Sequence, residues 1–430
     1  MNIIQIIPGS GGSFYCGNCL RDSKFVEALR EQGHNVVKIP MYLPLFSDEH
    51  DLGDTPVFYG AISIYLKQLM PVFRKAPKWF DKLLNSGPML KFAARMSGST
   101  DATGLEDMTI SMLMGEDGKQ KEELERMTDW IAEHCKPDVI HISNALLLGL
   151  AHKMKQKLNV PLVCSLQDED VWVDVMEPGV REGVWKLMAD KGKEIDAYIS
   201  VSSYFAERMK PVLDIPDHKL HTIHLGVNPD DYRFFERGKG ERHIGYVSRM
   251  CHENGMDILV DAFIRLKNDE KYADVKLILT GGSTGADTKF IKQNLNKLKK
   301  AGLTDHFEVL DEFEGEARHT FFERVSMISV PVRNGEAFGL YMIESMASGI
   351  PMVQPALGAF PEIINTTNGG VIYENNTPDE LEQALRTLLD DAEHHAKTSN
   401  NARKGVEKHF KIDKHANEMI AVYEKIRMNN

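Results

Sequence analysis

Short apolar runs alternate with stretches of helical periodicity along most of the chain. The apolar runs span residues 3–7, 36–39, 138–141, 159–168 (with the loop that follows), 197–203, 243–249, 275–280, 307–310, 327–332 and 369–372. Runs without polar alternation are typical of parallel strands that are buried on both faces. Strands that alternate with helices across short connections predict parallel sheets, so we expect an α/β fold.

The clearest strand–loop–helix–strand unit lies between residues 327 and 355. Its first strand is followed by a loop with Gly335 and Gly339, by a short helix and by a second apolar run. Gly349 is expected to end the helix. Because the loop follows the carboxyl end of a strand, where parallel sheets bind ligands, the unit predicts a binding site.

Two carboxylates lie in this unit, Glu336 in the loop and Glu344 in the helix, with seven residues between them. We expect Glu344 to lie close to the helix start, on the face away from Leu340 and Ile343. The backbone N–H groups of residues 338–340 suit an anion such as phosphate. Acceptors for hydroxyl groups beside donors for phosphate suit a nucleotide sugar. The alternative is a surface helix that carries two solvated glutamates.

The net charge of the chain argues against one class of partner, the nucleic acids. The 430 residues carry a formal net charge of -12 and give a sequence pI of about 5.8. A basic field that would collect the phosphates of a nucleic acid is lacking, so we expect no nucleic-acid partner.

Five cysteines are an odd and sparse set, which is typical of a reducing compartment. The start has no charged leader, and no run reaches the roughly 20 apolar residues that span a bilayer, so we expect a cytoplasmic protein.

Two local features stand apart from this pattern. Residues 61–96 alternate apolar with basic residues, and Asp81 is the one acidic residue among them. This segment is either an amphipathic helix packed on its own domain, a peripheral contact with an anionic membrane surface, or a contact with an anionic acceptor.

Cys16 and Cys19 form a C-x-x-C pair, for which a structural or incidental role and a redox or metal role stay open.

The stretch from Glu336 to Glu344 resembles the E-x7-E signature of the retaining glycosyltransferases of family 4. The resemblance implies the GT-B fold, in which two Rossmann-like domains with parallel sheets face each other. It also implies an enzyme of the hexosyltransferase type (EC 2.4) that takes its sugar from a nucleoside-diphosphate sugar and uses neither a metal nor a cofactor. The acceptor stays open among carbohydrates, lipids and small molecules.

The same resemblance implies roles for individual residues. Glu344 would bind the ribose hydroxyls. Glu336 would bind the sugar and stabilise the positive charge that develops on its ring. Phe338, Gly339 and Leu340 would meet the sugar or the diphosphate through their backbone N–H groups.

A glycine-rich loop after the first apolar run contains Gly11 and Gly12, although it is not a full G-x-G-x-x-G. The Gly-Gly pair and the later Gly33-His34 are similar to family 4, which implies that this loop touches the donor phosphates or the acceptor. A tight turn that needs a positive φ is the alternative.

Arg249 ends a predicted strand, where an arginine can hold a diphosphate through two parallel N–H bonds. The family pattern is Gly-Arg-Leu-x-x-x-Lys-Gly, and Asn254 replaces its lysine. One positive charge is therefore missing where a diphosphate departs, and His252 compensates for it in part if it is protonated. Two alternatives stay open: another GT-B enzyme of nucleotide sugars, such as an epimerase or hydrolase, and a weakly active protein that binds nucleotide sugars.

The acceptor is expected to bind in the first half of the chain. The candidates are His141, Gln167 and Asp168, which lie near the carboxyl ends of predicted strands. Family 4 enzymes often have His-Asp where this chain has Gln167-Asp168, and a glutamine cannot act as an acid or base. A solvated acidic loop is the alternative at this position.

The domain limits follow from the same pattern. We expect an acceptor-side Rossmann-like domain at residues 1–226, with a helical insertion at about 60–135, and a nucleotide-sugar-binding domain at residues 227–405. Residues 406–430 are expected to form a helix that crosses back onto the first domain.

Overall fold

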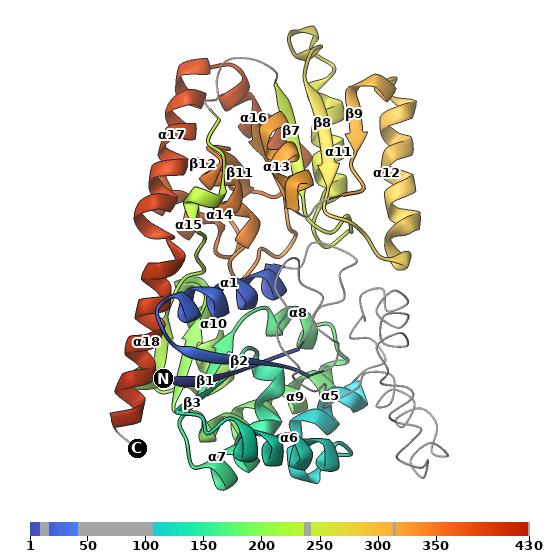
Figure 1. Ribbon diagram of the computed structural model, residues 1–430. Coiled ribbons are helices and arrows are strands. Elements are labelled where there is room, and N and C mark those ends of the chain that lie inside the picture. The colour runs from blue at the N-terminus through green and yellow to red at the C-terminus, as the bar shows by residue number, and fades with distance from the viewer. Residues whose placement is uncertain (9–16, 42–105, 236–241, 313–314, 429–430) are drawn as a thin grey trace. The chain divides into compact units, whose positions relative to one another are not determined.

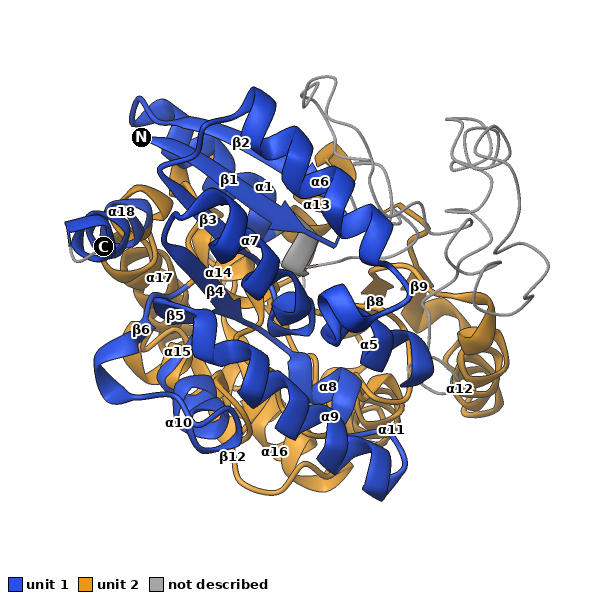
Figure 2. Cartoon of the chain, turned by 90° about the horizontal axis from the view of Figure 1, so that it is seen from below, with its two compact units in different colours: residues 1–12, 18–224, 416–430 blue, residues 13–17, 225–415 orange. Residues whose placement is uncertain are grey.

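The computed structural model describes residues 1–8, 17–41, 106–235, 242–312 and 315–428 (Figure 1). The chain forms two compact units, which Figure 2 shows in different colours. Unit 1 comprises residues 1–12, 18–224 and 416–430, and unit 2 comprises residues 13–17 and 225–415. The predictions for Gly11, Gly12, Cys16 and residues 61–96 lie outside the described residues.

Unit 1 holds a parallel sheet whose strand order, in the described part, is β2-β1-β3-β4-β5-β6. The strands are β1 (Asn2–Ile7), β2 (Asn35–Pro40), β3 (Val139–Ile142), β4 (Leu162–Leu166), β5 (Ala197–Ser200) and β6 (Leu220–Thr222). The helices are α1 (Gly17–Glu31), α5 (Glu106–Leu113), α6 (Lys121–His134), α7 (Ala151–Leu158), α8 (Glu169–Val173), α9 (Pro178–Lys191) and α10 (Ser203–Val212). Every residue of β3, β4 and β5 is buried, which explains why these strands are mainly apolar.

Unit 2 holds a second parallel sheet with the order β12-β11-β10-β7-β8-β9. Its strands are β7 (His243–Val247), β8 (Lys276–Thr280), β9 (Phe307–Val309), β10 (Met327–Ile328), β11 (Met352–Pro355) and β12 (Gly370–Tyr373). Its helices are α11 (Met256–Leu266), α12 (Thr288–Lys300), α13 (Gly315–Arg324), α14 (Leu340–Ala347), α15 (Phe360–Thr367), α16 (Pro378–Leu389) and α17 (Ala392–His409). The first strand of this unit therefore lies beside its fourth, as in a dinucleotide-binding Rossmann fold. The predicted α/β fold with two parallel Rossmann-like sheets is confirmed.

The strand predicted at residues 327–332 is shorter than expected, because β10 ends at Ile328. The chain turns directly afterwards: the N–H of Val332 donates to the carbonyl of Val330 at 2.8 Å. The N–H of Val330 donates to the side-chain Oε1 of Gln354 in the neighbouring strand β11, at 2.9 Å, instead of to a backbone carbonyl of that strand. The apolar run thus continues beyond the strand into the loop that carries Glu336.

The last helix, α18 (Ile412–Met428), belongs to unit 1 from Ala416 onward. Tyr423 of this helix is buried, and its hydroxyl lies 2.5 Å from Nδ1 of His141 in β3. Arg427 bonds Asp138 at 2.9 Å. These two contacts hold the C-terminal segment against the first sheet. Among the described helices, none combines the length and the apolar character needed to cross a membrane.

Candidate functional site

The candidate site of unit 2 lies where its strand order reverses. β7 pairs with β10 there, in a register that joins Ile244 to Met327 and Gly245 to Ile328. Open parallel sheets bind their ligands at such a point, outside the carboxyl ends of the strands. The two loops that begin there touch each other, since the N–H of Arg333 donates to the carbonyl of Glu253 at 3.0 Å.

Gly255 permits this close approach of the two loops. Its φ of +70° lies in the left-handed region, and a Cβ at this position would lie 2.0 Å from the carbonyl oxygen of Pro331. Any side chain at position 255 would therefore strain the backbone and push the loops apart.

Glu336 lies beside the start of α14. Its side chain is half-buried, and a Cβ on Gly339 would lie 3.0 Å from Oε2 of Glu336. Gly339, with φ +95°, is the N-cap of α14, and as a glycine it has no side chain with which to cap the helix. The loop is braced by a bond from the N–H of Ala359 to the carbonyl of Glu336 at 3.0 Å, and by edge-on packing of Phe338 against Phe410. The carboxylate of Glu336 therefore lies next to the N-terminus of α14, where the helix dipole is positive.

Glu344 lies inside unit 2, so the prediction that it faces away from Leu340 and Ile343 is wrong. Glu344 follows Leu340 by four residues, and side chains at that spacing share a helix face. All eight residues of α14 are buried, and Glu344 is 0% exposed. Tyr232 donates its hydroxyl to Oε1 of Glu344 at 2.7 Å, and Nη1 of Arg318 lies 3.5 Å from the same oxygen. The alternative of a surface helix with two solvated glutamates is excluded.

Arg249 follows β7 at the same edge of the sheet. Its Nε donates to Oδ2 of Asp287 and its Nη2 to Oδ1, both at 2.9 Å. Burial opposes the charge of Asp287, but the hydrogen bonds from Arg249 and Thr284 lower the pKa of this carboxyl below its usual value. The side chain of Asn254 is tied to the turn, where its Nδ2 bonds Oγ of Ser248 at 2.8 Å and the carbonyl of Arg249 at 3.2 Å.

In unit 1, His141 is a core residue. It is 1% exposed, and its Nε2 lies 2.8 Å from Oγ of Ser165 while Nδ1 contacts Tyr423. Burial, with a smaller effect of Arg21, lowers the pKa of His141 to about 3. Both ring nitrogens bond hydroxyl groups of unit 1 itself, those of Tyr423 and Ser165. In this arrangement neither nitrogen is available to bind the hydroxyl of a sugar acceptor.

Gln167 and Asp168 form the turn between β4 and α8. Nε2 of Gln167 donates to the carbonyl of Ser143 at 2.5 Å, and Nδ2 of Asn144 donates to the carbonyl of Gln167 at 3.1 Å, so this turn is joined to the turn after β3. Asp168 is half-buried, and its φ of +55° is rare for a residue other than glycine. Backbone strain of this kind gathers at functional sites.

Glu169 connects the turn after β3 with the turn after β4. It is 0% exposed, and its carboxylate accepts the N–H of Ala145 at 2.9 Å and the N–H of Gln167 at 2.7 Å. Burial raises the pKa of Glu169 to about 8, against the lowering effect of the backbone bonds. The acidic loop predicted at residues 168–170 is therefore not fully solvated.

Sequence reasoning missed Tyr232, Arg318 and Asp287, which hold the predicted residues Glu344 and Arg249. These partners are remote in sequence, and no local pattern joins them: 112 residues separate Tyr232 from Glu344. Among the described residues, no group of three or more His, Cys, Asp or Glu side chains is arranged to hold a metal ion. Cys135, Cys164 and Cys251 are free thiols.

Two family models match the chain. "Glycosyl transferases group 1" matches residues 229–405, and "Glycosyltransferase Family 4" matches residues 118–231. A lipopolysaccharide core biosynthesis mannosyltransferase of Rhizobium meliloti is 30% identical over 248 residues, which cover 54% of this chain and 67% of that protein. An MMP alpha-(1->4)-mannosyltransferase of Mycolicibacterium hassiacum is 26% identical over 305 residues, with 67% and 70% covered.

Solved structures show the same fold. Sucrose-phosphate synthase of Thermosynechococcus elongatus superposes with a TM-score of 0.74 at 18% identity, covering 100% of this chain and 99% of that one. HepE of Anabaena, in complex with UDP, superposes with a TM-score of 0.67 at 14% identity, covering 99% and 100%. The chain belongs to the glycosyltransferases of the GT-B fold and is a transferase of the EC 2.4 type.

Proposed function

We propose that this chain is a retaining glycosyltransferase that moves a sugar from a nucleoside-diphosphate sugar to a hydroxyl group of an acceptor. The observation that carries the proposal is the position of Glu336 beside the N-terminus of α14, at the switch point of unit 2. The helix N-terminus suits the diphosphate, and the carboxylate suits the sugar ring as it gains positive charge. Arg249, at the end of the neighbouring strand, suits the departing diphosphate.

In the transfer step, the bond between the sugar C1 and the diphosphate oxygen breaks, and its electron pair leaves with the diphosphate. The acceptor oxygen bonds C1 on the same face of the ring and gives its proton to the departing diphosphate oxygen. The roles of Gly339 and Leu340 follow from their place at the first turn of α14, where backbone N–H groups meet the diphosphate. The step needs no metal and no cofactor.

Relatives support a nucleotide-sugar donor. HepE of Anabaena has been solved with UDP-glucose, and two curated relatives are mannosyltransferases. On the acceptor side, Asp168 and Gln167 stay as candidates, since they lie at the carboxyl end of β4. His141 loses support because its ring is buried and bonded on both nitrogens.

A weakly active protein that binds nucleotide sugars is the second candidate. It is favoured by Asn254, which places an amide where the family has a lysine, and by the fork between Arg249 and Asp287, which offsets the charge of the arginine. Less positive charge then faces the departing diphosphate.

A donor panel tests both functions. UDP-, ADP- and GDP-sugars are mixed with the protein, with and without carbohydrate, lipid and small-molecule acceptors, while binding and nucleotide release are followed together. We expect binding of one donor and release that depends on an acceptor. Binding without release would favour the second candidate, release with a rearranged sugar would favour an epimerase, and no binding by any donor would contradict all of these functions.

A further inference from the structure

Three side chains form a buried polar cluster around Glu344 in unit 2. Glu344 is 0% exposed and Tyr232 is 4% exposed, whereas the Arg318 side chain, at 12%, is the most accessible of the three. The Tyr232 hydroxyl and the Arg318 guanidinium both address Oε1 of Glu344, at 2.7 and 3.5 Å. A carboxylate so far from water is tolerated because it receives a hydrogen bond and faces a cation.

Tyr232 is itself held from both sides. Its ring packs against His319 and Phe322 of α13, with centroid distances of 5.8 and 6.4 Å. Its carbonyl accepts a bond from Nη1 of Arg403 at 3.0 Å. The same nitrogen bonds the carbonyls of Pro229, at 2.8 Å, and of Ala347 at the end of α14, at 2.7 Å. Arg403 thus ties the segment before Tyr232 to the helix that carries Glu344.

We propose that Tyr232 and Arg318 are positioning residues that fix the Glu344 carboxylate for the two adjacent ribose hydroxyls of the donor. The inference rests on the proposed donor function and extends it to two residues outside the E-x7-E stretch. A ribose diol offers two O–H donors and two oxygen acceptors. Glu344 accepts the protons, and Arg318 donates to the oxygens.

Tyr232 and Arg318 act on Glu344 in different ways. A glutamate side chain has three rotatable torsions, and a bond of 2.7 Å from a tyrosine that is itself packed removes much of that freedom before the ligand arrives. Arg318 places a cation 3.5 Å from the Glu344 carboxylate, which favours its ionised form, and an ionised carboxylate forms the stronger bond to a hydroxyl. Because Arg318 is the most exposed of the three, an entering ribose meets it first.

The test uses the preference for ribose over deoxyribose. The affinity of the full chain for UDP, ADP and GDP is measured by calorimetry and compared with that for each 2′-deoxy nucleotide. A hydrogen bond to a charged group is worth about 1.5–3 kcal/mol, so we expect the wild type to prefer the ribose form by about 10- to 100-fold. In Tyr232→Phe, which keeps the ring, the preference should fall to within about threefold.

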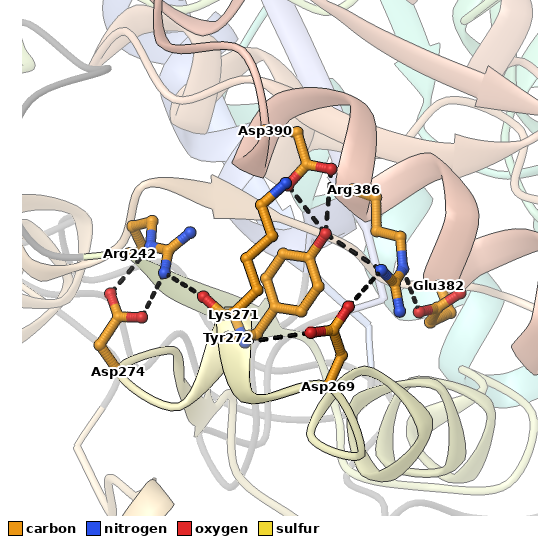
Figure 3. Close-up of polar contacts among 8 residues, drawn as sticks. All are labelled: Arg242, Asp269, Lys271, Tyr272, Asp274, Glu382, Arg386 and Asp390. Atoms are coloured by element: carbon orange, nitrogen blue, oxygen red, sulfur yellow. Dashed lines mark hydrogen bonds and ion pairs between the residues drawn. The ribbon is translucent and has the colours of Figure 1, made fainter.

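Tyr272→Phe is the matched control in the same unit. Tyr272 is also a buried tyrosine whose hydroxyl bonds a carboxylate, Asp390, at 2.8 Å and accepts from Arg386 at 3.2 Å (Figure 3). It precedes the amino end of β8, away from the switch point. We expect Tyr272→Phe to keep the wild-type preference for ribose, so a general loss of stability cannot account for the effect of Tyr232→Phe.

Arg318→Gln adds a second readout. Without the cation, the buried Glu344 takes up a proton more readily, so the ribose preference of this variant should shrink as the pH falls from 8 to 6 while that of the wild type stays constant. An unchanged preference in Tyr232→Phe, or tighter nucleotide binding in that variant, would overturn the inference while leaving the proposed function intact. A wild type that binds no nucleotide would overturn both.

Discussion

The guanidinium group of Arg249 is forked onto the carboxylate of Asp287, with Nε 2.9 Å from Oδ2 and Nη2 2.9 Å from Oδ1. This pair fixes the arginine at the edge of the sheet, since Asp287 is also held by the N–H of Thr284 at 2.7 Å. The fork also offsets the charge of the arginine, so the proposed donor site would depend more strongly on any second cation. In this chain the neutral Asn254 stands where the family 4 pattern has a lysine.

Restoring a lysine at position 254 should speed the transfer. Asn254→Lys adds a cation beside the departing diphosphate, and a single well-placed donor at a developing charge is worth about 100- to 1,000-fold in kcat at its upper range. We expect a smaller gain, of about tenfold, because Asn254 gives up its bonds to Ser248 and to the carbonyl of Arg249. The gain in kcat is measured as the rate of nucleotide release from the nucleotide sugar that the donor panel identifies.

Asn254→Gln is the control for this gain, because it changes the length of the side chain without adding charge. If Asn254→Lys left kcat at the wild-type value while binding the donor equally well, the missing cation would not limit the reaction. The substitution would then be a neutral departure from the family pattern.

The two glutamates of the E-x7-E stretch should separate turnover from binding. Glu336→Gln is expected to lower kcat by at least about 100-fold with little change in nucleotide affinity, because the amide cannot offset the positive charge of the ring. Glu344→Gln should instead weaken nucleotide binding, and Glu344→Ala should abolish it. Single-turnover kinetics and calorimetry on the same preparations distinguish these effects, and an unchanged affinity in Glu344→Ala would contradict the ribose role.

The sequence predicted the switch-point loop well, because both signals there are local. An apolar run marks β10, and Gly339 before a helical pattern marks the N-terminus of α14. The same local pattern was misread at Glu344. Its spacing of four from Leu340 predicts a shared face, and a buried charge of that kind requires partners that the sequence does not identify.

Those partners could not be found from the sequence, because the fold brings them together. Tyr232 meets Glu344 across 112 residues, and Glu169 is one of three consecutive acidic residues that composition cannot tell apart. In the structure, Glu169 points into the sheet edge and accepts two backbone N–H groups, whereas Asp168 beside it is half-buried. Only the turn geometry separates the buried Glu169 from the half-buried Asp168.

Acid should weaken unit 1 through His141. The pKa of its ring is about 3 in the fold against 6.5 in the unfolded chain, so the unfolded state binds more protons between these values. The free energy of unfolding therefore falls as the pH is lowered from 6.5 toward 3. We expect a shallower fall in His141→Gln, measured by urea unfolding between pH 3 and 4.5. An identical slope in the variant would assign the acid sensitivity to other groups.

Glu169 should act in the opposite direction at higher pH. Its pKa of about 8 in the fold exceeds the value of 4.5 in the unfolded chain, so the folded state binds the extra proton between these values. The free energy of unfolding should decrease as the pH rises toward 8 and then level off. Urea unfolding between pH 7.5 and 8.5, where His141 is neutral in both states, isolates this effect. Glu169→Gln is expected to remove the slope, and a retained slope would show that Glu169 ionises normally.

Gly255→Ala should separate the two loops of the proposed donor site. The added Cβ would lie 2.0 Å from the carbonyl oxygen of Pro331, and the φ of +70° is itself unfavourable for alanine. We expect a loss of about 2–3 kcal/mol in the stability of unit 2 and of at least about tenfold in nucleotide affinity, measured by urea unfolding and calorimetry. Gly302→Ala is the matched control, because Gly302 also has a positive φ, +77°, but no atom lies within 4 Å of the added Cβ. If both variants lost stability equally and kept their affinity, backbone strain alone would explain the result, and the contact between Gly255 and Pro331 would not shape the site.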